Sequence, residues 1–425
     1  MKEIVSFFTF GCKLNQYETE GMAELLQNDF MVTFDSEIAD IFVINSCTVT
    51  AEAERKLRQL YRRLKAKNPG SKFVIVGCYS ELSAGELKDL GFDLILGIKD
   101  KLKIKEFLKE NTENTCIKDY FQVTKGPYGR TRAYIGIQDG CLNNCSYCRI
   151  RLARGNKIIS KPPEVVAEEL KTLVEHGFQE IVLTGINIGF YGFGEGYSLI
   201  SLLKQLVKIE GEWRLRLSSL DPRLVSNELI TFMTDNPKIA QHVHLSLQSG
   251  SDKVLKSMNR NYTTNDVEQI VALFRSRNNR FSFTTDVIVG FPGETDTDFV
   301  ETLEFVKRIR FLKVHIFRFS PRPGTKAARM SNQISGNIKK ERATVLKKVA
   351  LEASKDYLNE HVGKESTVLI EKNDGIFSYG YDEFYIPHRV TGSIENGFVK
   401  VQIGGIEELE AFSDVELSCR SVAVR

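Results

Sequence analysis

The sequence predicts an α/β protein with an N-terminal open parallel α/β sheet, a central partial (β/α)6 barrel and a small C-terminal β-barrel. Short apolar runs alternate with helical patterns up to about residue 118, and the alternation resumes with wider spacing from about residue 133. The final stretch, roughly sixty residues, holds only short strand patterns separated by Gly, Asn and Asp. Alternating strands and helices favour parallel sheets, whereas strands alone favour a barrel or sandwich. The predicted domains are residues 1–118, 128–358 and 359–425.

The first domain contains four short apolar runs typical of buried parallel strands, at residues 4–10, 40–45, 72–77 and 92–96. Helical patterns separate them, near residues 15–28, 49–67 and 80–90. Cys12, Cys47 and Cys78 each come just past the end of one of these strands. Loops at the carboxyl ends of parallel strands share one edge, where such folds bind ligands. We therefore expect the three thiols to converge on a metal cluster, the alternative being three ordinary buried cysteines.

The second domain contains six strand candidates, at residues 133–138, 180–184, 213–218, 242–247, 281–289 and 314–319. Helical patterns between them cover residues 163–175, 199–209, 264–276 and 297–309. Barrels of this kind carry their chemistry at the C-terminal mouth of the strands. A basic, helical stretch from residue 337 to about 359 leads into the third domain, where strands are expected at residues 366–371, 380–386, 399–403 and 414–418.

The most informative motif follows the first barrel strand, where Cys141, Cys145 and Cys148 have C-x3-C-x2-C spacing. Thiolates are the ligands that iron–sulfur clusters prefer, and three ligands for four irons leave one iron open for chemistry. A structural zinc site requires a fourth ligand close by, but no Cys or His occurs between Cys148 and His176. An odd number of thiols cannot pair internally as disulfides. The spacing therefore indicates an iron–sulfur cluster rather than zinc or unligated thiols.

Composition is ordinary for a globular protein, with 42% hydrophobic and 27% charged residues. The sequence has no apolar run long enough to predict a membrane span and no targeting segment at its start. Eight cysteines free to bind metal indicate a reducing compartment, so we expect a cytoplasmic protein. The net charge of +3 is uneven, because residues 361–425 carry six Lys or Arg against eleven Asp or Glu. A basic partner surface is therefore expected in the body of the chain.

Further short motifs stand at residues 11–15 (Gly-Cys-Lys-Leu-Asn), 45–49 (Asn-Ser-Cys-Thr-Val), 77–78 (Gly-Cys), 137–141 (Ile-Gln-Asp-Gly-Cys), 217–219 (Leu-Ser-Ser), 244–251 (His-Leu-Ser-Leu-Gln-Ser-Gly-Ser) and 288–294 (Ile-Val-Gly-Phe-Pro-Gly-Glu). Together they resemble the motifs of the radical S-adenosylmethionine (SAM) methylthiotransferases over nearly the whole chain, including a terminal barrel similar to the TRAM domain of that family. Residues 11–15, with Tyr17-Glu18-Thr19 and the Ser-Pro-Arg-Pro-Gly-Thr of residues 320–325, resemble the branch that acts on N6-threonylcarbamoyladenosine at position 37 of tRNA.

This resemblance implies an enzyme that transfers a methylthio group to C2 of that adenosine, using SAM and two 4Fe–4S clusters. It implies that Cys141, Cys145 and Cys148 hold the cluster that splits SAM. Cys12, Cys47 and Cys78 are then expected to hold an auxiliary cluster whose sulfur accepts the methyl group. The SAM contacts expected from the same resemblance and from strand-end positions are Tyr147, Thr184, Gly185, Asn187, Ser218, Ser219, Gln248, Ile288 and Gly290. Each has a structural alternative, such as ordinary packing for the Tyr147 ring.

Basic residues crowd the predicted helix that follows Cys47: Arg55, Lys56, Arg58, Arg62, Arg63, Lys65 and Lys67. Such a run is often only a solvated helix face, but this helix begins at the edge expected to hold the auxiliary cluster. The candidate RNA contacts are Arg55, Arg58, Arg62, Arg318 and Arg322. The expected partners are the tRNA anticodon loop and a low-potential electron donor such as flavodoxin or ferredoxin. We expect a monomer with no membrane partner.

Other functions remain open at this point. One is the same chemistry on isopentenyladenosine tRNA or on a ribosomal-protein aspartate, whose enzymes usually read Gly-Cys-Gln-Met-Asn or Gly-Cys-Pro-Lys-Asn at the first motif. Another is a non-enzymatic iron–sulfur RNA-binding protein. Cys116 and Cys419 have no partner at metal spacing, and we expect both to be non-ligands.

Overall fold

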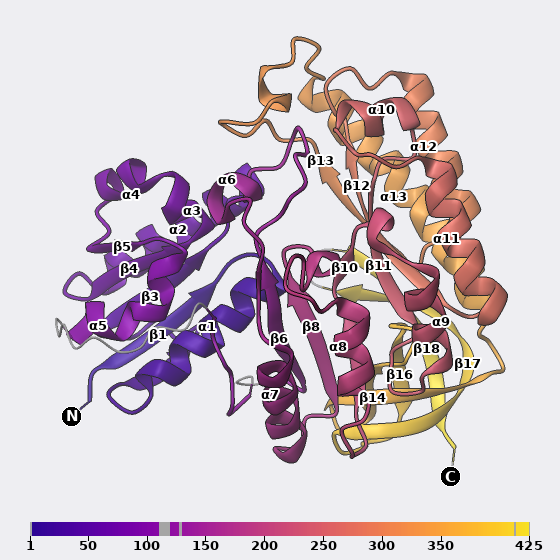
Figure 1. Ribbon diagram of the computed structural model, residues 1–425, viewed down its shortest axis with the longest axis horizontal. Helices are drawn as coiled ribbons and strands as arrows, with labels where there is room; N and C mark the ends of the chain where they lie inside the picture. Colours follow the sequence, from indigo (N-terminus) through magenta and orange to yellow (C-terminus); the bar gives the residue numbers. More distant parts are fainter. Residues whose placement is uncertain (1, 110–119, 127–129, 412–413, 425) are drawn as a thin grey trace.

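The structure is a computed structural model that describes residues 2–109, 120–126, 130–411 and 414–424 (Figure 1). The predicted α/β fold class is confirmed: a parallel sheet precedes a partial barrel of parallel strands, and a closed β-barrel ends the chain. In Figure 1 the N-terminal sheet lies at the left in indigo and purple, and the closed barrel lies at the lower right in yellow. No helix within the described ranges is long and apolar enough to cross a membrane. Cys116 lies outside the described residues.

The N-terminal sheet has five parallel strands in the order β2-β1-β3-β4-β5. They are β1 (Ile4–Thr9), β2 (Met31–Phe34), β3 (Ile41–Ser46), β4 (Lys72–Gly77) and β5 (Leu94–Leu96). The helices are α1 (Lys13–Leu26), α2 (Ala51–Lys67), α3 (Cys78–Leu82), α4 (Ala84–Leu90) and α5 (Ile104–Lys109). Both faces of the sheet are buried, because Val43 packs in the core around α1 while Phe42 and Ile44 pack in the core around α2. This explains the continuous apolar runs of the strands.

Three details of this domain differ from the expectation, and the first is α5, which no predicted helix covers. The four expected strands omit β2, a four-residue edge strand of sequence Met-Val-Thr-Phe whose side chains are half-buried or exposed. The helix expected over residues 80–90 is two helices, α3 and α4. The chain leaves helical geometry between them at Ser83, where φ is −143° and ψ is 37°.

The partial barrel is built from parallel strands β6 (Arg132–Asp139), β8 (Glu180–Gly185), β9 (Arg214–Leu217), β10 (Ser219–Leu220), β11 (His242–Gln248), β12 (Ser282–Val289) and β13 (Lys313–Arg318). Ser218 separates β9 from β10, and the short β7 (Ile159–Ser160) pairs antiparallel with β6. The helices are α6 (Ile150–Arg154), α7 (Pro163–Glu175), α8 (Leu199–Leu206), α9 (Asn227–Asp235), α10 (Asp252–Ser257), α11 (Thr264–Arg277), α12 (Asp296–Ile309) and α13 (Gly336–Asn359). The predicted strands and main helices match within a few residues, but α6, α9 and α10 were not expected.

The C-terminal barrel is closed, in the order β14-β15-β16-β18-β17. Its strands are β14 (Glu365–Asn373), β15 (Phe377–Tyr381), β16 (Pro387–Thr391), β17 (Gly397–Ala411) and β18 (Asp414–Ala423). The strand expected at residues 380–386 is wrong: residues 382–386 form a turn in which the Asp382 carboxylate accepts hydrogen bonds from the backbone of Phe384 and Ile386 (2.9 and 2.8 Å). This turn packs on the central barrel, where the Glu383 carbonyl accepts a hydrogen bond from the Gln241 backbone (2.9 Å).

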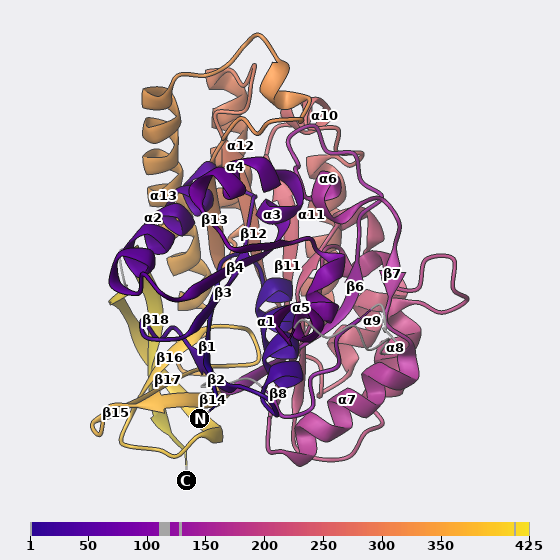
Figure 2. The same cartoon turned by 90° about the vertical axis from the view of Figure 1, so that its left-hand side faces the viewer.

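The N-terminal domain lies across the open side of the partial barrel, between β6 and β13 (Figure 2). On one side, α1 packs on β6 so closely that a Cβ on Gly136 would lie 2.6 Å from the Tyr17 ring. On the other side, Arg322 follows β13 and forms an ion pair with Glu54 of α2. The carboxyl edge of the first sheet is therefore held against the mouth of the barrel.

Candidate active site

Three cysteines stand at the carboxyl edge of the N-terminal sheet. Cys12 precedes α1 after β1, Cys47 follows β3, and Cys78 begins α3 after β4. The strands β1 and β3 are neighbours at the point where the strand order reverses, and an open α/β sheet binds its ligands in the crevice at that point. The topology therefore brings together three thiols that are far apart in the sequence.

Asn15 and Ser46 bind the three cysteine-bearing loops to one another. The Asn15 amide donates hydrogen bonds to the carbonyl oxygens of Phe10 (2.9 Å) and Ser46 (3.0 Å). The Ser46 hydroxyl donates to the Val76 carbonyl (2.5 Å) and accepts from the Tyr79 backbone N–H (3.3 Å). Both side chains are buried. These bonds fix the positions of the loops before Cys12, Cys47 and Cys78.

The surroundings of the three thiols are tightly packed. Gly11 has φ +115°, and a Cβ there would lie 3.3 Å from the Cys47 Sγ and closer still to its Cβ, so the backbone approach depends on glycine. Burial raises the pKa of the Cys47 thiol to about 12, with Cys78 and Cys12 adding to the rise. Metal binding would relieve this, because a metal displaces the thiol proton. Within the described ranges, no three His, Cys, Asp or Glu side chains are placed to hold a single metal ion. A 4Fe–4S cluster is larger than one ion, so its cysteine ligands stand farther apart.

The second set of thiols lies in the loop after β6. Gly140 opens the loop at φ +78°, where a Cβ would lie 2.0 Å from the Lys157 carbonyl oxygen. Ser146 anchors the loop: its N–H and its hydroxyl donate to the carbonyls of Met258 and Ser257 (both 2.9 Å), and its carbonyl accepts from Ala327 (2.8 Å). These partners follow β11 and β13. The loop is therefore held across the C-terminal mouth of the barrel, where barrel enzymes place their chemistry.

A buried arginine stands beside these thiols and was missed by sequence reasoning. Arg260 donates hydrogen bonds to the Cys145 Sγ (3.6 Å) and to the Ser246 carbonyl (2.7 Å). Burial raises the pKa of the Cys148 thiol to about 11 and also raises that of Cys141. Arg260 is 115 residues from Cys145 in the sequence, and no local motif indicates its role. Its positive charge counteracts the rise in the pKa of Cys141, and a cluster requires thiolates.

Two of the expected SAM contacts have a buried polar atom that forms no hydrogen bond within the described part of the chain. Asn187 and Ser218 are buried at the carboxyl ends of β8 and β9. The Asn187 Oδ1 and the Ser218 Oγ have no hydrogen-bond partner among the described residues. Buried polar atoms are rarely left unpaired in native proteins. The orphaned atoms at the barrel mouth therefore fit a polar ligand such as SAM.

The other expected SAM contacts also lie at strand ends. Thr184 and Gly185 end β8, and Ser219 begins β10. Gln248 ends β11 with φ +74°, which is uncommon for a residue with a side chain. Gly290 has φ +70°, and a Cβ there would lie 2.3 Å from the Lys339 side chain. Tyr147 and Ile288 pack in one apolar cluster with Phe291. This packing is compatible with a SAM contact at Tyr147 and with a purely structural ring.

The two cysteine sites are joined by a buried ion-pair network. Glu54 accepts hydrogen bonds from Thr48 (2.6 Å), Arg149 (3.1 Å) and Arg322. Thr48 directly follows Cys47, and Arg149 directly follows Cys148. Arg149 also donates to the Thr48 hydroxyl (2.8 Å). One carboxylate therefore holds a residue from each cysteine loop.

A second buried network lies nearby. Arg154 donates to Asn15 (2.9 Å), to Glu18 (2.8 and 3.0 Å) and to Asp139 (2.8 Å). Burial opposes ionisation of Glu18, but Arg154 and Lys101 together lower its pKa to about 2. Arg154 thus joins the residue that orders the first cysteine edge to the strand that leads into the second cysteine loop.

The candidate RNA contacts have different environments. Arg55 and Arg62 are exposed on α2, where Arg55 pairs with Glu52 (2.5 Å). Arg58 is half-buried and donates to the Tyr79 hydroxyl (2.8 Å). Arg318 is exposed at the end of β13. Arg322 is buried and paired with Glu54, so its guanidinium is occupied within the protein and is not exposed to RNA.

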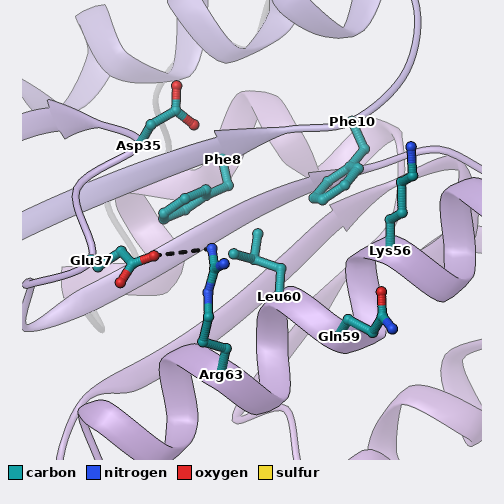
Figure 3. A pocket seen from close by; sticks show the side chains of 8 residues that line it. All are labelled: Phe8, Phe10, Asp35, Glu37, Lys56, Gln59, Leu60 and Arg63. Atoms are coloured by element: carbon teal, nitrogen blue, oxygen red, sulfur yellow. Dashed lines mark ion pairs between the residues drawn. The ribbon is translucent and has the colours of Figure 1, made fainter. Parts of the chain in front are cut away.

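A hollow of about 530 Å³ lies beside the exposed face of α2 (Figure 3). It is lined by Phe8, Phe10, Asp35, Glu37, Lys56, Gln59, Leu60 and Arg63. Arg63 pairs with Glu37 across it (3.0 Å). Phe10 stands two residues before Cys12, so the hollow adjoins the first cysteine edge. It combines aromatic rings with cations, as single-stranded nucleic-acid sites do.

Known proteins share both the sequence and the fold of this chain. Residues 135–306 match the radical SAM superfamily model, and residues 4–97 match a model described as an uncharacterized protein family. The chain is 43% identical to a Thermotoga maritima protein named threonylcarbamoyladenosine tRNA methylthiotransferase MtaB, over 97% of this chain and 96% of that protein. A Bacillus subtilis protein of the same name is 34% identical over 95% of this chain and 91% of the relative. The chain belongs to the radical SAM methylthiotransferase family.

Members of this family with another named substrate are also similar. A Pelotomaculum thermopropionicum tRNA-2-methylthio-N(6)-dimethylallyladenosine synthase is 35% identical over 85% of both chains. Among solved structures, the radical SAM methyltransferase TsrM from Kitasatospora setae matches with a TM-score of 0.55 over 77% of both chains. Its identity is 14%, so this likeness shows the fold alone. As a radical SAM methylthiotransferase, the protein is an enzyme, and its class implies a 4Fe–4S cluster and SAM.

Proposed function

We propose that this methylthiotransferase modifies tRNA, transferring a methylthio group to C2 of N6-threonylcarbamoyladenosine at position 37 of the anticodon loop. The observation that carries the proposal is the 43% identity, over 97% of the chain, to a relative named for that substrate. The geometry supports it, because two separate sets of three thiols stand on facing edges of two domains. Transfer of a methylthio group needs one site that generates a radical and another that holds sulfur.

In this proposal Cys141, Cys145 and Cys148 hold one 4Fe–4S cluster, and Cys12, Cys47 and Cys78 hold a second. When bound, the clusters and SAM supply the radical and sulfur chemistry, which side chains alone cannot provide. The chain positions these groups and excludes water. Asn187 and Ser218 offer their unpaired oxygens to SAM, and Arg260 compensates thiolate charge at Cys145. Asn15 and Ser46 order the auxiliary site.

The partners follow from the same chemistry. Reductive cleavage of SAM requires one electron at a time, so we propose a low-potential donor such as flavodoxin or ferredoxin. The tRNA substrate supports a cytoplasmic location, and the monomeric state stays a prediction. The target adenosine has to leave its stack to expose C2, as other enzymes that act on bases require.

The test is the nucleoside content of tRNA from a strain that lacks this gene, before and after complementation. We expect the 2-methylthio form of threonylcarbamoyladenosine to disappear on deletion and return on complementation, measured by mass spectrometry of digested tRNA. Loss of 2-methylthio-isopentenyladenosine instead would assign the chain to the other tRNA branch. Persistence of both forms in the deletion strain would contradict the proposal. Formation of 5′-deoxyadenosine by anaerobically reconstituted protein separates an enzyme from a plain iron–sulfur RNA-binding protein.

The exposed face of α2 is proposed as part of the RNA surface. Replacing Lys56 and Arg62 together by Ala should weaken binding of any anticodon stem-loop and reduce the slope of log affinity against log salt by about 0.7–0.9 per lost phosphate contact. Fluorescence anisotropy at several salt concentrations measures both. Lys171→Ala, on the exposed face of α7, is the matched control and should change neither. An unchanged salt slope in the double variant would exclude α2 from the interface.

A further inference from the structure

Polar side chains line the inner wall of the barrel on its last three strands. Along β11 and β12, Val243, Leu245 and Val287 are fully buried in the core beneath the outer helices. Side chains alternate between the two faces of a strand, so His244 and Asp286 face the interior. Their side chains are 12% and 28% exposed. A packed apolar core would fill this space, and these strands instead present ionisable groups to it.

The groups on this wall contact one another. The His244 Nε2 lies 3.2 Å from the Asp286 carboxylate, and its Nδ1 lies 3.0 Å from the Thr284 hydroxyl. The His244 and His315 rings are 5.8 Å apart. Asp286 and His315 are direct partners in the pairing of β12 with β13. The hydrogen bonds orient the His244 ring, which lies beside the His315 ring.

Lys13 brings a positive charge to this wall from the other domain. It directly follows Cys12 at the start of α1, and its side chain is half-buried. Burial raises the pKa of Asp286, but His244, His315 and Lys13 outweigh it and lower that pKa. Burial and His244 lower the pKa of His315 to about 4, and Lys13 contributes. The Lys13 ammonium forms no ion pair or hydrogen bond with a side chain in the described part of the protein.

We propose that Lys13, His244, Asp286 and His315, here called the inner polar cluster, bind the polar substituent on N6 of the substrate adenine. Lys13 pairs with the carboxylate of the threonylcarbamoyl group. The two imidazoles and the Asp286 carboxylate exchange hydrogen bonds with its hydroxyl and urea groups. The inference rests on the proposed function and names the residues that select this substrate.

The position of Lys13 supports this role. The auxiliary site has to present sulfur to C2 of the adenine, and Lys13 is the residue after Cys12. An adenine placed there has its N6 substituent within reach of groups around the same site. A hydrocarbon substituent such as isopentenyl would cover the inner polar cluster without forming ion pairs or hydrogen bonds with its side chains. A site built for hydrogen bonds rejects a ligand that leaves buried polar groups unpaired, by factors reaching about 10⁴ or more.

The test changes the substrate and the protein separately. Anticodon stem-loops carry threonylcarbamoyladenosine, or the same nucleoside with its carboxylate converted to a carboxamide. Binding is measured by anisotropy under anaerobic conditions, without reductant, on protein with a verified iron content. We expect wild type to bind the carboxylate RNA about ten- to a hundredfold more tightly, the range for a hydrogen bond to a charged group. Lys13→Met should abolish this preference, Lys13→Arg should keep most of it, and Lys88→Met, an exposed lysine on α4, should keep it all.

The outcomes distinguish the inference from the proposed function. Equal binding of the two RNAs by wild type overturns the inference without any variant, even if one of the variants fails to fold. An unchanged preference in Lys13→Met also overturns it, while methylthiolation of the carboxylate RNA by wild type leaves the proposed function intact. If wild type methylthiolates only an isopentenyladenosine stem-loop, the proposed function itself fails, and the inner polar cluster loses its assigned ligand.

Discussion

Replacing Cys12 by Ala should halve the iron content, from about eight to about four irons per chain, because a cubane needs its thiolate ligands. The cysteine loop of the barrel is anchored through Ser146 to other segments of the barrel. The variant should therefore still cleave SAM to 5′-deoxyadenosine. It should form no methylthiolated product, a loss of at least about a thousandfold (~4 kcal/mol). Iron analysis, deoxyadenosine yield and nucleoside mass spectrometry measure the three effects.

The reciprocal variant and a neutral one make this result specific. Cys141→Ala should lose SAM cleavage and product together while keeping the auxiliary irons. Cys419 lies fully buried in the core of the C-terminal barrel, so Cys419→Ala should keep both clusters and both activities. A Cys12→Ala protein that still contains about eight irons, or that still makes product, would contradict the assignment of the auxiliary site.

The parts of the site that the sequence predicted depend on short-range patterns. The loop of Cys141, Cys145 and Cys148 is recognisable because all its members lie within eight residues. The proximity of Cys12 and Cys47 could be predicted from the sequence because the strand ends of a parallel sheet share an edge. The same rule located Ser218 and other expected SAM contacts at strand ends. These predictions need only the order of strands, not the details of packing.

The features that escaped prediction depend on long-range packing. Glu54 and Arg322 are 268 residues apart and pair only because two domains meet. Arg322 therefore looked in the sequence like a free cation for RNA. Residues 382–386 looked like a strand because Phe384 and Ile386 are apolar, but the Asp382 side chain competes for their backbone and makes a turn. Neither effect leaves a periodic signal.

Glu54→Gln should be among the most destabilising single substitutions in this protein. The side chain is buried and accepts hydrogen bonds from Thr48, Arg149 and Arg322. Removal of its charge leaves two buried guanidinium groups without their carboxylate. Breaking a buried ion pair by changing one partner costs about 3–5 kcal/mol. Thermal unfolding of the wild-type and variant proteins measures the loss.

Glu52→Gln is the matched control, because Glu52 lies two residues earlier on the same helix and forms an exposed pair with Arg55. An exposed pair contributes about 0–1 kcal/mol, so this variant should unfold close to wild type. The two substitutions also separate the effect of Glu54 on protein stability from its effect on the positions of the two cysteine loops. Since Glu54 holds the residues that follow Cys47 and Cys148, its loss should reduce methylthio transfer more than SAM cleavage at a temperature where the variant stays folded. Equal losses of both activities would show that Glu54 does not couple the two cysteine sites. Equal stability of the two variants would contradict the predicted cost of breaking the buried ion pair.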